Sequence, residues 1–267
     1  MLLKACLNGN RGRDEHPALP ISPAELALEA HHSMVEGAKA VHVHPRAADG
    51  TESLEPHTVR LCLEAIRRAC PDLPVGITTA AWVEPDPERR VWLAERWDVL
   101  PDFASVNLSE EGVAELVEAL LRRGVGVEAG VVDQGDVDRL ERFGFAERCL
   151  RVLVEIDEEG DGAAAVAGAE AVDEQLDRAG ISPPRLYHAG GIATWAVLDR
   201  ALVLGRDVRV GLEDTLVLPD GRPARDNAAL VRAAAAMARV KASPSRARRL
   251  GSGYSRHRLP AQAEPTR

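Results

Sequence analysis

Short apolar runs alternate with longer segments of helical periodicity along most of the chain. The apolar runs cover residues 2–8, 40–44, 74–79, 103–108, 125–131, 150–156, 185–189 and 208–213. The helical segments lie near residues 24–37, 57–70, 87–97, 110–123, 135–143, 162–179, 193–204 and 225–241. Continuous apolar runs are typical of strands that are buried on both faces of a parallel sheet. Eight strand–helix units in this order predict an α/β fold, the (β/α)8 TIM barrel.

An open, doubly wound sheet is the alternative architecture. Such a sheet usually carries a glycine-rich GxGxxG turn after its first strand, and neither this pattern nor a Walker pattern follows residues 2–8. The length of 267 residues also suits one barrel. We therefore expect residues 1–242 to form a single catalytic domain and residues 243–267 to form a separate tail.

The first helix has a clear start signal. Ser22 is expected to be its N-cap, with Pro23 at the first helical position and Glu25 completing a capping box. Gly37 is expected to end the same helix before the second strand.

The composition restricts the core and the compartment. Hydrophobic residues make up 45% of the chain and aromatic residues only 3%, so the core has to be built from Ala, Val, Leu and Ile. The four cysteines (Cys6, Cys62, Cys70 and Cys149) form no CxxC pair, and we expect buried thiols in a reducing cytosol. The first residues are too short an apolar run for a signal peptide, and no segment reaches a membrane helix of roughly 18 apolar residues. We expect a soluble, cytoplasmic protein that does not enter a membrane.

The net charge of −9 argues against a general nucleic-acid binder, which needs a basic surface for phosphates. The charge is uneven, however, because residues 241–267 carry seven Lys/Arg and one Glu. We expect a flexible, solvated tail. The functional alternative is an arm that binds the phosphates of a cofactor or reaches the site of a neighbouring subunit.

Two histidines end the second apolar run. Side chains alternate along a strand, so His42 and His44 point to one side while Val41 and Val43 point to the other. The two imidazoles stand about 7 Å apart along the strand, at its carboxyl end, where barrel enzymes have their active sites. They are candidate metal ligands. The alternative is a pair of hydrogen-bonded core histidines.

A carboxylate in the last run can complete a metal site. Arg209, Gly211 and Glu213 share one side of the expected strand 208–213, and the last strand of a barrel lies beside the first. Catalytic zinc usually takes three protein ligands, and two histidines with one carboxylate suit zinc or a similar divalent ion. The alternative for Glu213, taken alone, is an acid that caps a helix or lies on the surface.

Other polar residues stand at the carboxyl ends of the expected strands and predict a polar pocket. They are Asn8, Thr78, Thr79, Ser105, Asn107, Glu128, His188, Arg209 and Asp214.

These residues occur in an order that resembles the β-keto acid cleavage enzyme family, which includes 3-keto-5-aminohexanoate cleavage enzyme. The resemblance extends from residue 4 to about residue 240. It rests on Asn8-Gly9, residues 17–25, Glu36-Gly37-Ala38, His42-Val43-His44, Asp49-Gly50, residues 209–214 and residues 227–231.

The resemblance implies a zinc-bound barrel, usually a homotetramer, that exchanges acyl groups between a β-keto acid and acetyl-CoA. By position, His42, His44 and Glu213 would be the zinc ligands. Arg209 and Asp214 would match the pair that transfers protons, and Thr78 and Ser105 would match substrate-binding positions. Glu128 would match the first of two glutamates on the fifth strand, also a catalytic position, and the second falls on Gly130. Asn107 and His188 are further candidates for substrate contact.

We expect Asp214, beside Arg209, to keep a low pKa and to stay ionised until substrate displaces the arginine. The alternative for this pair is a structural ion pair that braces the last strand.

The chain departs from the family pattern near the pocket. Arg11 stands where the best-known member has a glutamate that receives an ammonium group, and a cation there would repel an ammonium. We therefore expect a substrate with an acidic or neutral distal end, although Glu15 could reach the same place. Ala80 and Ala81 replace glycines after the third strand and are expected to narrow the pocket beside the substrate. His188 is an additional titratable group.

Two other functions remain open. A different divalent-metal barrel, an aldolase or hydrolase, would share the metal ligands without depending on CoA. A non-catalytic relative would only bind a ligand at the barrel mouth.

Overall fold

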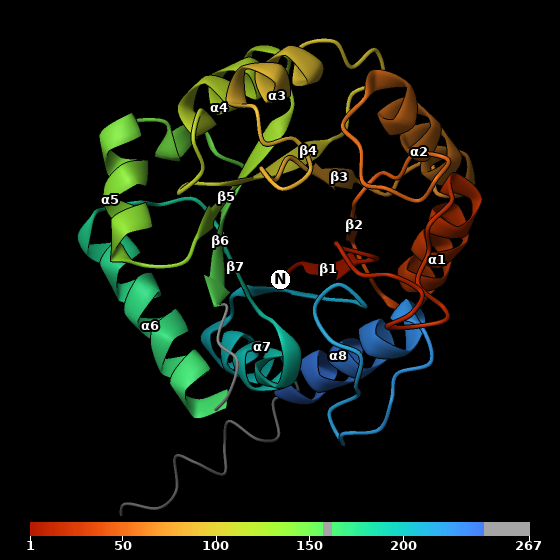
Figure 1. The fold of residues 1–267 in the computed structure, drawn as a ribbon. Helices are drawn as coiled ribbons and strands as arrows, with labels where there is room; N and C mark the ends of the chain where they lie inside the picture. The colour runs from red at the N-terminus through yellow and green to blue at the C-terminus, as the bar shows by residue number, and fades with distance from the viewer. Residues whose placement is uncertain (157–161, 243–267) are drawn as a thin grey trace, which may run out of the picture.

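The computed structural model describes residues 1–156 and 162–242, which form a closed barrel of parallel strands in sequence order, with β8 pairing with β1. Figure 1 shows the strands at the centre and the helices around them. The strands are β1 (Leu3–Cys6), β2 (Ala40–Val43), β3 (Val75–Thr78), β4 (Phe103–Asn107), β5 (Gly126–Val131), β6 (Arg151–Ile156), β7 (Arg185–Ala189) and β8 (Asp207–Val210). The predicted (β/α)8 barrel is confirmed.

Each strand is followed by a helix. The helices are α1 (Pro23–Glu36), α2 (Pro56–Ala69), α3 (Pro87–Ala94), α4 (Val113–Arg122), α5 (Gln134–Phe143), α6 (Gly162–Arg178), α7 (Thr194–Leu204) and α8 (Asn227–Ala242). Two short 3-10 helices, η1 (Ala146–Arg148) and η2 (Gly191–Ala193), precede β6 and α7. Helix α8 is described as far as Ala242, and the expected domain boundary at this residue stays a prediction. The basic tail expected for residues 243–267 lies outside the described residues, as do residues 157–161.

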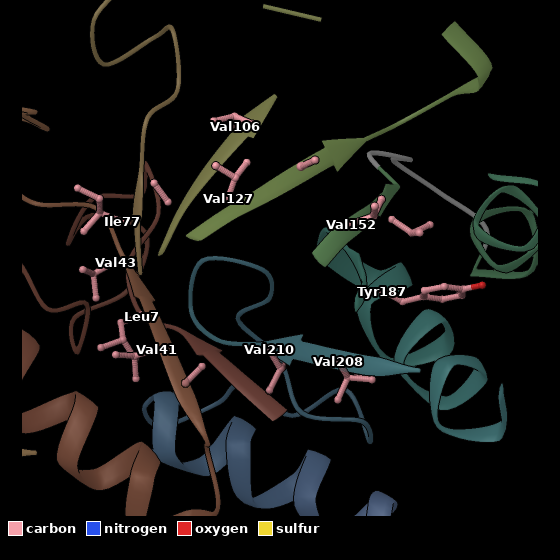
Figure 2. Close-up of a cluster of buried hydrophobic side chains, with 14 of the residues drawn as sticks. Leu7, Val41, Val43, Ile77, Val106, Val127, Val152, Tyr187, Val208 and Val210 are labelled. Atoms are coloured by element: carbon pink, nitrogen blue, oxygen red, sulfur yellow. The ribbon is translucent and has the colours of Figure 1, made fainter. Parts of the chain in front are cut away.

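The outward-facing side chains of the strands form the main core. Val41 and Val43 of β2 are fully buried against the helices, as are Val208 and Val210 of β8. Figure 2 shows this layer of mostly aliphatic side chains carried by successive strands. Because apolar side chains occupy the outer face, the polar residues that alternate with them face the barrel interior.

The interior near the amino ends of the strands holds charged residues. Lys4 of β1 forms an ion pair with Glu128 of β5, and both side chains are fully buried. Arg151 Nε lies 3.1 Å from the other oxygen of Glu128, and its Nη1 lies 3.6 Å from Asp207. The Lys4 ammonium also lies 5.5 Å from the ring centroid of Phe103. The four charges compensate one another, as buried charges must.

No described helix is long and apolar enough to cross a membrane. The four cysteines are free and buried, as the sequence predicts. Burial raises the pKa of the Cys62 thiol to about 12, so this thiol stays protonated and unreactive at neutral pH.

The start of α1 is the predicted capping box. The Ser22 hydroxyl accepts a hydrogen bond from the Glu25 amide, and the Glu25 carboxylate accepts one from the Ser22 amide. Gly37 ends the helix with φ 120°, a conformation that favours glycine.

Ser22→Ala should lower the free energy of unfolding by about 1 kcal/mol, while Ser22→Thr should retain most of the wild-type stability.

The pKa of Glu25 is lowered from 4.5 to about 2, chiefly by the hydrogen bond from the Ser22 amide. A lowered carboxyl pKa stabilises the fold above pH 4.5, and this stabilisation is lost as the pH falls towards 2. Urea unfolding of wild type and Glu25→Gln across this pH range checks this, because the variant should lack that loss.

Candidate active site

His42 and His44 stand side by side at the carboxyl end of β2. Both are buried, and their ring centroids lie 5.2 Å apart. The side chain of Asn8 fixes the backbone of His44 on both sides. Its Nδ2 donates to the His44 carbonyl, and its Oδ1 accepts from the His44 amide, each at 2.9 Å. The strand alternation therefore orients the two imidazoles as predicted.

Glu213 reaches the same place from a turn, not from a strand. The expected strand 208–213 ends early, because β8 stops at Val210. Gly211 packs so closely on β1 that a Cβ there would lie 1.8 Å from the carbonyl oxygen of Cys6, and the chain turns at this contact. Asn227 accepts a hydrogen bond from the Leu212 amide at 2.8 Å. The turn is thus held against the barrel rim.

Gly9 leaves the space that the Glu213 side chain fills. A Cβ at Gly9 would lie 2.5 Å from Cγ of Glu213, and the glycine has φ +56°. Both the open space and the left-handed backbone therefore require a glycine here.

The three side chains have the geometry of a metal site. One Glu213 oxygen, Oε2, lies 3.9 Å from His42 Nε2 and 3.8 Å from His44 Nε2. One nitrogen or oxygen from each residue lies within 4.8 Å of the others, which suits an ion with bonds of about 2.0–2.2 Å to each. Glu213 Oε2 is buried and has no hydrogen-bond partner among residues 1–156 and 162–242. The residues present therefore fit a divalent ion.

Two further features favour metal binding by the imidazoles. His44 Nδ1 is hydrogen-bonded to the carboxylate of Glu52, an arrangement that leaves Nε2 free for a metal and fixes the ring. Burial lowers the pKa of His42 well below its usual value. The His42 ring is therefore neutral, which is the state that can bind a metal.

Arg209 links the metal-site carboxylate to its neighbour. Its guanidinium forms ion pairs with Glu213 and Asp214, and its Nε donates to Asp214 Oδ1 at 3.1 Å. Burial alone would raise the pKa of Glu213, but the adjacent Arg209 guanidinium opposes it, and the pKa of Glu213 is lowered.

The low pKa expected for Asp214 is wrong. Burial raises the pKa of this carboxyl above its usual value, and the charge of Glu213 adds to the rise, although Arg209 opposes both. The arginine was correctly predicted as its partner, but the sequence did not show how completely the carboxyl leaves water. A buried carboxyl with a raised pKa is better suited to accepting a proton near neutral pH.

The carboxyl ends of the strands enclose a cavity of about 340 Å³. Its lining is Gly9, Asn10, His42, His44, Thr78, Ala80, Trp82, Ser105, Asn107, Glu155, Ile156, His188, Gly190, Arg209, Glu213 and Asp214. The structure thus brings together the three candidate metal ligands, the Arg209–Asp214 pair and four candidate substrate contacts. Those four are Thr78, Ser105, Asn107 and His188.

Five predicted pocket residues do not line the cavity: Asn8 and Thr79 of the polar set, and the three candidate catalytic or substrate-binding residues Glu128, Ala81 and Arg11. Glu128 lies in the charged interior beside Lys4 and Arg151, so its placement does not support contact with substrate. Ala81 lies just outside, where its amide donates to Glu110 at 2.9 Å. Arg11 lies at the rim, where its Nε donates to the Glu213 carbonyl at 3.3 Å and its Nη1 pairs with Glu15.

Sequence reasoning missed Glu155 and Trp82 in the lining. Glu155 Oε1 lies 3.2 Å from His188 Nε2, and His188 Nδ1 lies 3.8 Å from Asp214. Burial would raise the pKa of Glu155, but the adjacent His188 outweighs it and lowers that pKa to about 2. The alternation that placed Glu213 on the interior side also applies to β6 and would have found Glu155. Trp82 lies in a loop and has no such signal.

A (β/α)8 barrel that gathers three candidate metal ligands and an ion pair at its carboxyl end has the architecture of a barrel enzyme. Residues 1–250 match the model of the beta-keto acid cleavage enzyme family, and the chain belongs to that family. The resemblance seen in the sequence is therefore confirmed.

Individual relatives agree with this assignment. The chain is 28% identical over 271 residues to a 3-keto-5-aminohexanoate cleavage enzyme of Fusobacterium nucleatum subsp. nucleatum, which covers 94% of this chain and 97% of the relative. It is 26% identical over 275 residues to an enzyme of the same name from Acetoanaerobium sticklandii, with the same two coverages, 94% and 97%.

Among solved structures, the barrel resembles the ternary complex of ObcA with a C4-CoA adduct and oxalate. The TM-score is 0.66 at 20% identity, over 81% of this chain and 62% of ObcA. The chain thus spans less than two thirds of ObcA, and the likeness shows a shared fold.

Glu128→Gln tests whether this carboxylate is structural. The change leaves Lys4 and Arg151 as buried cations with less compensation, and we expect it to lower the free energy of unfolding by about 3–5 kcal/mol. The matched control is Glu64→Gln, because Glu64 is an exposed residue of α2 and should tolerate the change. Denaturant unfolding measures both. A Glu128→Gln protein that keeps its stability but loses activity would restore the catalytic role for Glu128.

Proposed function

We propose that the chain is a zinc-dependent β-keto acid cleavage enzyme that exchanges acyl groups with acetyl-CoA. The observation that carries the proposal is the convergence of His42, His44 and Glu213 in one cavity beside the Arg209–Asp214 pair. Family membership supports the reaction class. The ObcA complex with a C4-CoA adduct supports a CoA co-substrate.

His42, His44 and Glu213 would hold the ion. A divalent metal bound there would act as a Lewis acid that stabilises negative charge on the keto oxygen of the substrate. Glu52 holds the His44 ring, and Asn8 holds its backbone. These contacts keep the metal-binding atoms in place before substrate arrives.

Asp214 is the proposed proton-transfer residue. Its Oδ2 is buried without a hydrogen-bond partner in the described part of the chain, whereas Oδ1 accepts a hydrogen bond from Arg209. The free oxygen can take a proton from the carbon between the carboxylate and the keto group of the substrate, and the same carboxyl can return it to that carbon in the acetoacetate product. Arg209 keeps the carboxylate oriented while the proton moves.

The other polar residues that line the cavity are proposed to bind the substrate through hydrogen bonds. Thr78, Ser105 and Asn107 come from the ends of β3 and β4 and present hydroxyl and amide groups to the cavity. His188 is buried, and its Nε2 lies 3.2 Å from Glu155. Its Nδ1 has no hydrogen-bond partner within the described part of the chain and can donate to a substrate oxygen. The cavity of about 340 Å³ suits a small keto acid, and the bulk of CoA would remain outside it.

The substrate is proposed to have an acidic or neutral distal end. Arg11 is a cation at the rim, bonded to the carbonyl of Glu213, and it disfavours an ammonium group there. Its ion pair with Glu15 weakens this effect without reversing it. A cytoplasmic homo-oligomer, a tetramer as the family resemblance implies, completes the proposal.

The test of the function is acyl exchange with and without metal. Purified protein should contain about one zinc per chain and should convert a β-keto acid and acetyl-CoA into a new CoA thioester and acetoacetate. Chelation should abolish the acyl exchange, and added zinc should restore it.

Asp214→Asn should lower kcat by about 100-fold or more with the metal content unchanged.

The His42→Ala variant should lose both metal and activity. His57→Ala is its control, because His57 is an exposed residue. Cleavage that proceeds equally well without acetyl-CoA would instead indicate a metal-dependent aldolase or hydrolase. A protein that binds no divalent metal would contradict the proposed mechanism.

Arg11→Glu should shift the substrate preference towards a cationic keto acid. Because the rim is partly exposed, we expect a change of about fivefold in the ratio of kcat/KM for 3-keto-5-aminohexanoate over 3-oxoadipate, or about 1 kcal/mol. Arg225→Glu makes the same charge change at a side chain that is 91% exposed and should leave the ratio unchanged. An unaltered preference in Arg11→Glu would remove Arg11 from the specificity argument.

A further inference from the structure

Trp82 is an exposed aromatic residue at the mouth of the cavity. The side chain lines the cavity, yet the residue is 58% exposed. Aromatic residues make up only 3% of the chain. A large apolar surface left in water next to a binding cavity is typical of a recognition surface.

The loop that carries Trp82 is anchored at several points. The Thr79 hydroxyl donates to the Ser105 carbonyl at 2.6 Å, and the Ala81 amide donates to Glu110 at 2.9 Å. Glu110 is in turn held by Arg90 at 3.0 Å. Trp82 is therefore presented from a fixed backbone, so binding against it costs little conformational entropy.

The ring lies next to a candidate metal ligand. Its centroid is 6.3 Å from that of His44, and the two planes are inclined by only 21°. A keto acid bound at the three metal-binding residues would place its acyl chain, on the far side of the keto carbon, within reach of this ring. The apolar lining residues Ala80 and Ile156 give such a chain further contact.

We propose that Trp82 is a specificity-determining residue that selects β-keto acids with a neutral, apolar acyl chain. The inference rests on the proposed function and narrows its substrate class. An anionic chain end would meet the negative face of the indole. An ammonium would be attracted by that face, and this is the alternative that a cationic substrate tests.

The adenine ring of CoA is a less suitable occupant. The pantetheine arm separates adenine from the thioester, and the thioester must reach the carbon that reacts. Adenine would therefore lie well outside the cavity, whereas Trp82 stands beside its metal-binding side chains.

The kinetic test compares Trp82→Ala with Trp82→Phe on a long and a short substrate. With acetyl-CoA present, Trp82→Ala should raise KM for 3-oxooctanoate about tenfold and leave KM for 3-oxopentanoate within about threefold, with kcat little changed. Trp82→Phe should retain most of the preference. The control is Trp92→Ala, because Trp92 is a 45% exposed residue of α3 that packs against Arg96, outside the cavity lining.

Three results would overturn the proposal. An equal rise in KM for both substrates, or a fall in kcat with metal loss, would mean that Trp82 only supports His44. A selective loss of 3-keto-5-aminohexanoate binding would make Trp82 a cation site. Unchanged kinetics in Trp82→Ala would remove it from recognition altogether.

A binding measurement separates this inference from the proposed function. Zinc-loaded protein is titrated with 3-oxooctanoate without acetyl-CoA, and tryptophan emission is recorded. Wild type and Trp92→Ala should both respond, and Trp82→Phe should not. If no keto acid is turned over but this response is present, the proposed acyl exchange fails while the role of Trp82 stands; no response in wild type refutes the role of Trp82.

Discussion

Closure of the parallel barrel is the constraint on which the site depends. β1 pairs with β2 on one side and with β8 on the other, so residues separated by about two thirds of the sequence meet across a single strand. The carboxyl end of β2 supplies His42 and His44, and the turn after β8 supplies Glu213. Asn8, which follows β1 between them, fixes the backbone of His44. An open sheet would leave its two edge strands apart, and the three ligands could not converge.

Two groups of charged residues lie at different depths in the barrel interior. Near the amino ends, Lys4 and Glu128 are fully buried and compensate each other, with no contact to the cavity. Near the carboxyl ends, Glu213 and Asp214 each keep one buried oxygen without a hydrogen-bond partner among the described residues. Glu128 Oε1 also lacks a hydrogen bond there, but Arg151 Nε lies 3.1 Å from it, whereas Glu213 and Asp214 line the cavity. The same chemical groups thus have structural or functional roles according to whether they lie in the buried ion-pair network or at the cavity.

Periodicity and strand alternation were sufficient to predict the barrel, the helix starts and the interior direction of His42. They failed where a close three-dimensional contact decides the backbone. Glu213 was placed on a strand, but the contact of Gly211 with the Cys6 carbonyl ends β8 at Val210. Glu128 has the right alternation for the interior, yet depth along the barrel determines whether such a residue meets solvent or Lys4.

Burial and loop geometry account for the other differences. The raised pKa of Asp214 comes from loss of water around it, which an adjacent arginine in the sequence does not reveal. Trp82 lies beyond β3 in a loop whose course depends on the distant Glu110. Glu155 of β6 shares the interior side of its strand with Leu153, so the alternation rule alone could have placed it there.

The two oxygens of the Glu213 carboxylate face different partners, and this difference affects how an ion would be bound there. Oε1 forms an ion pair with Arg209, whereas Oε2 faces the Nε2 atoms of His42 and His44. The ion pair with Arg209 therefore favours Oε2 as the oxygen that Glu213 would offer to an ion, together with the two imidazole nitrogens. An ion held by these three donors would leave a position for a substrate oxygen.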